Sequence, residues 1–201
     1  MVLNKSVMPV VIRAIRDPGQ WEDLSQSKPG WVFILGGAID SVAESVARLQ
    51  RMRCTVFVHV DMVKGLSSDF DGIRFFQDFA SPDGIITTHQ HTINHAKKLG
   101  LAAIQRVFLL DSQSVDSGIQ QIAHAEADAV EVLPGVLPLL IRYLCQRISK
   151  PLIAGGLVKT EQQVLDALAA GAVSVSSSTE ALSRKLWKRD SLQGPTAMPQ
   201  H

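Results

Sequence analysis

Residues 151–164, PLIAGGLVKTEQQV, contain one complete unit of the fold that we predict for the whole chain. A short apolar run ends in Gly155 and Gly156, and Thr160 then opens an amphipathic segment typical of a helix. Glycines between a buried strand and a helix allow either a tight turn or the close approach of a ligand to the backbone.

The same alternation of a short apolar run and an amphipathic stretch recurs along the chain. The predicted strands lie at 9–15, 31–37, 55–61, 83–88, 101–108, 128–135, 151–156 and 172–178. Near-continuous apolar strands separated by helices are typical of a parallel sheet covered on both faces. Eight such units predict an α/β fold, a TIM-like (β/α)8 barrel forming a single domain over residues 1–187. An open doubly wound sheet is the alternative, and residues 188–201, which lose the periodicity, are predicted to be a mobile tail.

Two of the predicted helices illustrate the pattern between the strands. Val42, Val46 and Leu49 share one face of the first, within residues 41–52. The second, within residues 161–171, carries an apolar set and ends at Gly171. That set is Val164, Leu165 and Leu168.

Composition narrows the class of protein. The 201 residues are 46% hydrophobic and 19% charged, which fits a soluble globular domain with a large core. A net charge of +1 excludes a globally basic nucleic-acid binder but permits a local basic patch. Cys54 and Cys145 form neither a disulfide framework nor a zinc motif. No segment resembles a signal peptide or a membrane span, so we expect a cytoplasmic protein without a membrane partner.

Residues for a phosphate site follow the last two predicted strands. Parallel barrels carry their sites at the carboxyl ends of the strands, and phosphate commonly binds after strands seven and eight. Gly155 and Gly156 end the seventh strand, and Ser177 and Ser178 end the eighth. We predict that the backbone amides of these four residues hold a phosphate or similar oxyanion. The alternative is that the glycines only make a turn and the serines only cap a helix.

Other polar residues at the strand ends are candidates for ligand contact. His59 and Asp61 are two apart and are predicted to point to the same side of the third strand. They fit a hydroxylated ligand, a structural hydrogen bond or, with Glu131 as third ligand, a metal; we predict no metal. Arg106 lies in an apolar strand and needs an acid or an anionic ligand, with Glu131 as the natural partner. Lys64 is a candidate Schiff-base lysine of an aldolase-like enzyme, with a solvated side chain as the alternative.

A basic cluster lies near the carboxyl terminus of the chain. Its members are Arg184, Lys185, Lys188 and Arg189. The prediction is a solvated face, with nucleic-acid contact as the alternative.

Four stretches together resemble one family. They are HVDMVKGL (59–66), QRVFLLDSQS (105–114), DAVEVLPGVLP (128–138) and IAGGLVKTEQQV (153–164). The combination is similar to the glycerol-3-phosphate-responsive antiterminators, bacterial regulators of glycerol uptake operons, and the likeness extends from Val10 to Trp187. It implies a barrel that binds glycerol 3-phosphate and then acts on the leader mRNA of glycerol genes, so that transcription passes a terminator.

The resemblance also implies a set of ligand-pocket residues. They are His59, Asp61, Lys64, Arg106, Glu131, Gly155 and Gly156. His89 is a departure, because the resemblance leads us to expect a lysine or arginine in that loop, and a neutral imidazole is a weaker phosphate partner.

These observations lead to one predicted function and two alternatives. The prediction is a metabolite-sensing antiterminator that takes glycerol 3-phosphate as effector, needs no cofactor, binds leader mRNA and forms a homodimer. The first alternative is an isomerase, lyase or phosphodiesterase acting on a small phosphorylated substrate, since barrels host many chemistries. The second is a phosphate-binding scaffold with a protein partner.

Overall fold

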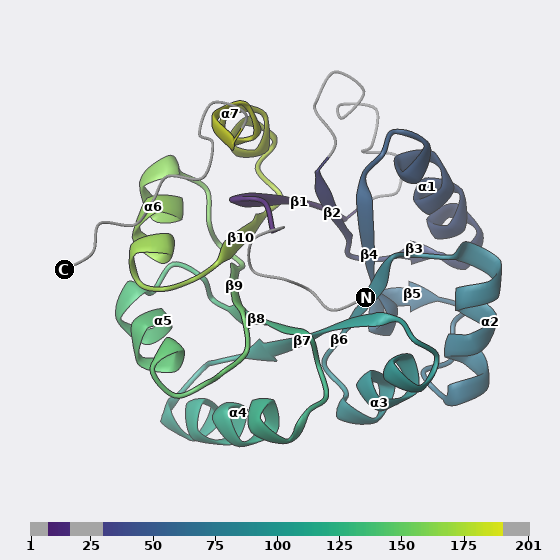
Figure 1. The fold of residues 1–201 in the computed structure, drawn as a ribbon, viewed down its shortest axis with the longest axis horizontal. Coiled ribbons are helices and arrows are strands. Elements are labelled where there is room, and N and C mark those ends of the chain that lie inside the picture. Colours follow the sequence, from purple (N-terminus) through teal and green to yellow (C-terminus); the bar gives the residue numbers. More distant parts are fainter. Residues whose placement is uncertain (1–7, 17–29, 191–201) are drawn as a thin grey trace.

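The computed structural model describes residues 8–16 and 30–190 of the chain. Within these residues, eight parallel strands close into a barrel, and helices surround it as an outer ring (Figure 1). The predicted (β/α)8 barrel is therefore confirmed, and the open doubly wound sheet is wrong. None of the described helices combines the length and apolarity that crossing a membrane requires.

The barrel strands lie within the eight predicted runs. They are β1 (Val11–Ile15), β2 (Trp31–Ile34), β4 (Thr55–His59), β6 (Gly84–Thr87), β7 (Ala102–Phe108), β8 (Ala129–Leu133), β9 (Leu152–Gly155) and β10 (Ser174–Ser177). Each pairs with the next in this order, and β1 pairs with β10 to close the ring. Several predicted strands end earlier than expected: the second ends at Ile34 and the third at His59, where Val60–Met62 forms a 3-10 helix, η3. A separate two-stranded pair joins β3 (Gly37–Ala38) to β5 (Val63–Lys64).

The helices of the described residues follow the strands in turn. They are α1 (Ile39–Arg51), α2 (Phe70–Ala80), α3 (Gln90–Lys98), α4 (Ser112–His124), α5 (Pro138–Cys145), α6 (Glu161–Ala169) and α7 (Glu180–Asp190). Helix α7 continues past the predicted domain boundary at residue 187. Residues 191–201 of the predicted tail lie outside the described part of the chain.

Helix α6 begins where its sequence predicts. The Thr160 hydroxyl accepts a hydrogen bond from the backbone N–H of Gln163, and the Gln163 side chain accepts one from the N–H of Thr160. This reciprocal cap satisfies two N–H groups that the helix itself leaves unpaired. The predicted apolar face is wrong in one position: Leu165 is 43% exposed, and Ala167 joins Val164 on the buried side.

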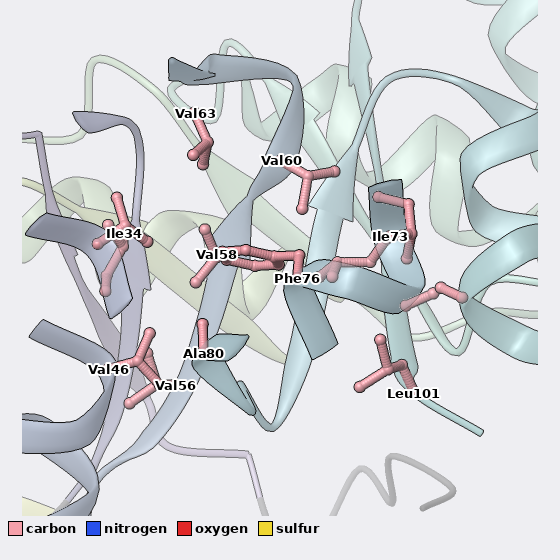
Figure 2. Packing of buried hydrophobic residues seen from close by; sticks show 14 of the residues in the cluster. Ile34, Val46, Val56, Val58, Val60, Val63, Ile73, Phe76, Ala80 and Leu101 are labelled. Carbon is pink, nitrogen blue, oxygen red and sulfur yellow. The ribbon is translucent and has the colours of Figure 1, made fainter. Parts of the chain in front are cut away.

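Side chains alternate between the inside and the outside of the barrel, as the pleat of a strand requires. One buried cluster fills the interior and includes Phe33, Phe57 and Ile104 from three different strands. Two further clusters lie between the sheet and the helices. In the one drawn in Figure 2, Phe76 of α2 packs with Val58 of β4. The core therefore has two layers, and a polar group within either layer requires a partner.

Candidate functional site

The interior of the barrel becomes polar at the carboxyl ends of its strands. Arg106 lies two residues after the interior Ile104, and Glu131 lies two residues after the interior Ala129, so both side chains point inward. By the same alternation His59 of β4 follows the interior Phe57. All three side chains are buried. The structure thus brings together three of the predicted site residues at the end where parallel barrels carry their sites.

Glu131 is the centre of this polar cluster. Its Oε2 accepts a hydrogen bond from Nε of Arg106 at 2.7 Å, and its Oε1 accepts one from the Ser176 hydroxyl at 2.5 Å. Arg106 is 6% exposed and Glu131 1% exposed, so this is a buried ion pair. The predicted Arg106–Glu131 pairing is confirmed, and the two residues also face each other in the register of β7 and β8.

Gly155 leaves the space that the Glu131 carboxylate occupies. A Cβ placed on Gly155 would lie 2.5 Å from Oε1 of Glu131 and 2.7 Å from the Ser176 hydroxyl oxygen. Gly156 is different, because its φ of +77° is a backbone conformation that side chains disfavour. Both glycines therefore have a structural reason to be glycine, and the prediction that they hold a phosphate stays a prediction.

The loops after β8 and β9 are joined next to this cluster. The backbone N–H of Gly135 donates to the carbonyl of Gly156 at 3.1 Å. The N–H of Leu109, after β7, donates to the carbonyl of Leu133 at 2.8 Å. Backbone hydrogen bonds therefore join the start of the loop after β7 to the end of β8, and the loop after β8 to the loop after β9.

Arg106 retains hydrogen-bonding capacity. Only its Nε has a hydrogen-bond partner among the described residues, so the N–H groups of its two terminal nitrogens make no bond with that part of the chain. Each terminal nitrogen carries two N–H groups. A buried guanidinium with unused donors suits an oxygen-rich or anionic ligand.

His59 is held in its neutral form. Burial is the main cause, and the positive charge of Arg106 adds to it; together they lower the pKa of His59 to about 4. Nδ1 of the ring is buried and has no hydrogen-bond partner among the described residues. A neutral imidazole can both accept and donate hydrogen bonds, which suits a hydroxyl group better than a phosphate.

The pKa of His59 predicts a pH dependence of stability. In the unfolded chain His59 takes up a proton below about pH 6.5, whereas in the folded protein it does so only near pH 4. Because the unfolded state binds more protons between these values, the free energy of unfolding should fall as pH decreases from 6.5 to 4. The slope from this one group is at most about 1.4 kcal/mol per pH unit. His59→Gln should remove that slope from urea unfolding measured across the window.

The matched control for this prediction is His124→Gln. His124 is exposed on α4, so this variant makes the same substitution outside the buried cluster. Equal pH dependence of the wild type and His59→Gln would contradict the assignment of a neutral, buried His59.

Asp61 has a different role from the one that its spacing suggests. It lies in η3, outside β4, and its carboxylate accepts hydrogen bonds from the Thr87 hydroxyl and from the N–H and hydroxyl of Thr88. Partial burial alone would raise the pKa of Asp61, but these hydrogen bonds outweigh it and the pKa lies below its usual value. The carboxylate therefore fastens η3 to the end of β6, and the predicted shared strand with His59 is wrong.

Lys64 stands on a strand that is not part of the barrel sheet, and its ligand contact stays a prediction. It is exposed in β5, which pairs with β3 outside the barrel sheet. An exposed amine lacks the desolvation that activates a Schiff-base lysine.

No three His, Cys, Asp or Glu side chains of the described residues are placed to hold a metal ion. The oxygens of Glu131 and Asp61 are already engaged by Arg106, Ser176 and the two threonines.

The serines that end β10 divide into three roles. Ser176 points inward to Glu131, while the Ser177 hydroxyl donates to the Val158 carbonyl and accepts from the N–H of Thr179. Ser178 is exposed, and its carbonyl accepts a hydrogen bond from Arg13. The hydroxyls of Ser176 and Ser177 are therefore engaged within the protein, and contact of an oxyanion with the Ser177 and Ser178 amides stays a prediction.

Two residues of the site were missed from the sequence. Ser176 stands in the same run as Ser177 and Ser178, and the alternation of β10 would have identified it as the inward-facing member. Arg13 is 4% exposed on β1, and its side chain donates to the Ser178 carbonyl in the loop after β10. A buried charge in a predicted strand was the available signal.

Comparison with known proteins gives the same family as the motifs. Residues 11–187 match the family described as glycerol-3-phosphate responsive antiterminator. The glycerol uptake operon antiterminator regulatory protein of Listeria monocytogenes is 32% identical, with a TM-score of 0.81 over 86% of this chain and 93% of that one. A related protein of Thermotoga maritima is 35% identical, with a TM-score of 0.76 over 90% and 99% of the two chains.

A further relative is YgcP of Escherichia coli strain K12. It is 32% identical over 166 residues, which are 83% of this chain and 87% of that protein. The family match spans nearly all of the barrel, including the strands that carry Arg106, Glu131 and Ser176. The chain belongs to the glycerol-3-phosphate-responsive antiterminator family.

Proposed function

We propose that this protein senses glycerol 3-phosphate and, when the ligand is bound, acts as a transcription antiterminator on the leader mRNA of glycerol utilisation genes. Membership of the family supports the proposal. The structural observation that carries it is the buried Arg106–Glu131–Ser176 cluster, in which Arg106 keeps unused donors at the carboxyl end of the barrel. Such a cluster is suited to a small ligand that has both an anionic group and hydroxyls.

The proposed pose places the two ends of the ligand on different residues. The phosphate lies on the backbone amides of Gly155–Gly156 and Ser177–Ser178, near the start of α7, where a helix N-terminus favours an anion. The hydroxyls face Arg106, Glu131 and the neutral His59. Asp61 shapes the pocket through η3, since its carboxylate already accepts three hydrogen bonds from Thr87 and Thr88.

The ligand can control RNA binding only if the RNA-binding conformation of the protein and its other conformation differ in affinity for the ligand. In our proposal the ligand orders the loops after β8, β9 and β10, because its contacts reach the strand ends from which these loops start. The homodimer predicted from the sequence stays part of the proposal, and light scattering of the purified protein tests it.

Isothermal titration calorimetry tests the ligand half of the proposal. Glycerol 3-phosphate should bind at one site per chain, and glycerol should bind at least about a hundredfold more weakly because it lacks the charge-assisted hydrogen bonds of the phosphate. Glu131→Gln should lower the affinity for glycerol 3-phosphate, whereas Asp116→Asn, a substitution of an exposed residue on α4, should leave it unchanged. Equal affinity for the two ligands, or binding of neither, would disprove ligand sensing.

The RNA half is tested separately. Leader transcripts of glycerol uptake genes should bind more tightly when glycerol 3-phosphate is present. Binding that is unaffected by the ligand would contradict a ligand-controlled antiterminator while leaving RNA binding intact.

One observation favours an enzyme as the second candidate. His59 is neutral, has a free Nδ1 and lies near a carboxylate and a guanidinium, which is a set of groups found in general acid–base catalysis. Turnover of a small phosphorylated substrate by the purified protein, abolished by both His59→Ala and Glu131→Ala, would establish this candidate. Ligand binding without turnover favours the sensor.

A further inference from the structure

One helix of the barrel lies in a long stretch without acidic residues. From Val132 to Thr160 the chain contains no Asp or Glu, and its cations are Arg142, Arg147, Lys150 and Lys159. Helix α5 occupies the middle of this stretch, on the outside of the ring between α4 and α6 (Figure 1). Its surface charge is therefore positive despite the near-neutral total of the chain.

The cations of α5 differ from those of the basic cluster on α7. Arg184 pairs with Glu180 at 2.6 Å, and Lys185 pairs with Glu161 at 2.5 Å, so that half of the α7 cluster is neutralised. The side chains of Lys188 and Arg189 lie outside the part of the chain that the structure describes. Arg142 and Arg147 are exposed and form no ion pair with any described residue. Of these two groups, the cations of α5 and of the turn after it are therefore the more available to a polyanion.

An aromatic ring is fixed beside these cations. The guanidinium carbon of Arg147 lies 3.6 Å from the centroid of the Tyr143 ring, and Nη1 of Arg147 donates to the Tyr143 carbonyl at 3.1 Å. Tyr143 is 40% exposed, so part of its ring faces solvent. A base can stack on an exposed aromatic ring or on a guanidinium plane, and phosphates bind the arginines.

The exposed residues of this region share one side of the helix. They are Leu139, Arg142, Tyr143, Gln146 and Arg147, which we call the α5 face. Their spacing of three and four residues places them in a single row along α5 and the turn after it. The row combines an aromatic ring, two cations and an amide, which is a composition typical of single-stranded RNA contact.

A second copy of the chain fits this surface less well. A two-fold contact centred on the α5 face would place arginines of one copy against arginines of the other, with no acidic residue on α5 to offset them. An RNA strand brings its own negative charge and flat bases. Charge complementarity therefore favours RNA over self-association.

The α5 face is also connected to the ligand site. Helix α5 begins at Pro138, a few residues after Glu131 on β8. The intervening loop is held to the neighbouring loop by the hydrogen bond from Gly135 to Gly156. A ligand that contacts Glu131 and Gly156 therefore touches the strand before this segment and the loop to which the segment is hydrogen-bonded.

From these observations we infer that the α5 face is the surface that contacts single-stranded RNA. The inference rests on the proposed function, which supplies the RNA partner. It goes beyond that function by naming the surface and the roles of its residues: Arg142 and Arg147 bind phosphates, and Tyr143 stacks on a base.

The test uses the full chain with saturating glycerol 3-phosphate and a fluorescein-labelled, thiouridine-containing pool of single-stranded RNA of random sequence. Arg142→Glu/Arg147→Glu should lower affinity at least about tenfold and reduce the slope of log affinity against log salt by about 1.4, because each lost phosphate contact removes about 0.7. Tyr143→Ala should lower affinity about tenfold, and Tyr143→Phe, which keeps the ring, should not. Photocrosslinks should map to peptides of α5.

The matched control is Arg51→Glu/Lys98→Glu, which reverses two exposed cations on α1 and α3 and so changes the net charge equally. It should retain most of the affinity. Equal losses in both double variants, or crosslinks outside α5, would overturn the inference and leave the proposed function standing. Absence of RNA binding by the wild type would overturn the inference and the RNA half of the proposed function, while calorimetry reports on ligand sensing. A wild-type dimer that Tyr143→Ala dissociates, with unchanged RNA affinity, would identify the α5 face as a protein interface instead.

Discussion

Replacement of Arg106 by alanine is expected to lower the free energy of unfolding by about 3–5 kcal/mol, the usual cost of removing one partner of a buried ion pair. Glu131 is 1% exposed, so its charge would be left inside the barrel with, among the described residues, only the Ser176 hydroxyl as a hydrogen-bond donor. Urea unfolding at neutral pH measures the loss. Binding of glycerol 3-phosphate should disappear with it, since the unused donors of Arg106 are removed as well.

Two further variants separate charge from packing. Arg106→Met/Glu131→Gln removes both charges at similar volume and should regain most of the lost stability without regaining ligand binding. Arg74→Ala removes one partner of an exposed pair with Asp71, whose side chains are 56% and 79% exposed, and should change stability by less than about 1 kcal/mol. A loss at Arg106→Ala as small as that at Arg74→Ala would show that the buried pair is not the stabilising element that we describe.

Gly155→Ala is expected to cost up to about 3 kcal/mol and to abolish ligand binding, although it adds only one methyl group. The new Cβ would lie 2.5 Å from Oε1 of Glu131, and neither the carboxylate nor the Ser176 hydroxyl can move without breaking their hydrogen bond. Thermal and urea unfolding, together with calorimetry, measure both effects.

Gly118→Ala adds the same methyl group at another buried glycine. There the new Cβ would lie 3.1 Å from the ends of the Leu109 and Val107 side chains, which can shift, and alanine favours the helix by about 1 kcal/mol. Its stability should stay within about 1 kcal/mol of the wild type. If Gly155→Ala behaves like Gly118→Ala, Glu131 has room to move and the site is less rigid than its contacts indicate.

Much of the fold could be predicted from the sequence because buried parallel strands leave a strong local signal. Runs such as residues 55–61 are continuous and β-branched, and helix caps such as Thr160 are fixed by residues three apart. The end of β4 could not be predicted, since Val60 is as apolar as the residues before it, and Asp61 in η3 is held by hydrogen bonds from Thr87 and Thr88. Those partners are far away in sequence.

The site was predictable where a buried charge demanded a partner. Arg106 in an apolar strand pointed to Glu131, and the structure pairs them. The exposure of Lys64 and Ser178 could not be predicted, because it depends on how the chain turns after a strand, which local sequence does not determine; their ligand contacts stay predictions. The structural role of Gly155 could not be predicted either. A side chain is excluded there because the Glu131 carboxylate on the neighbouring strand occupies the space.

The hydrogen bond from Gly135 to Gly156 connects the loop that leads into α5 with the proposed ligand site. If metabolite and transcript both bind as we propose, their binding equilibria are coupled through this loop. Coupling between two binding sites is reciprocal. RNA on the α5 face must therefore raise the affinity for glycerol 3-phosphate by the same factor by which glycerol 3-phosphate raises the affinity for RNA. The concentration of metabolite at which half of the protein responds would then fall as leader transcript accumulates. The sensitivity of the protein to glycerol 3-phosphate would then depend on the amount of leader RNA as well as on the protein itself.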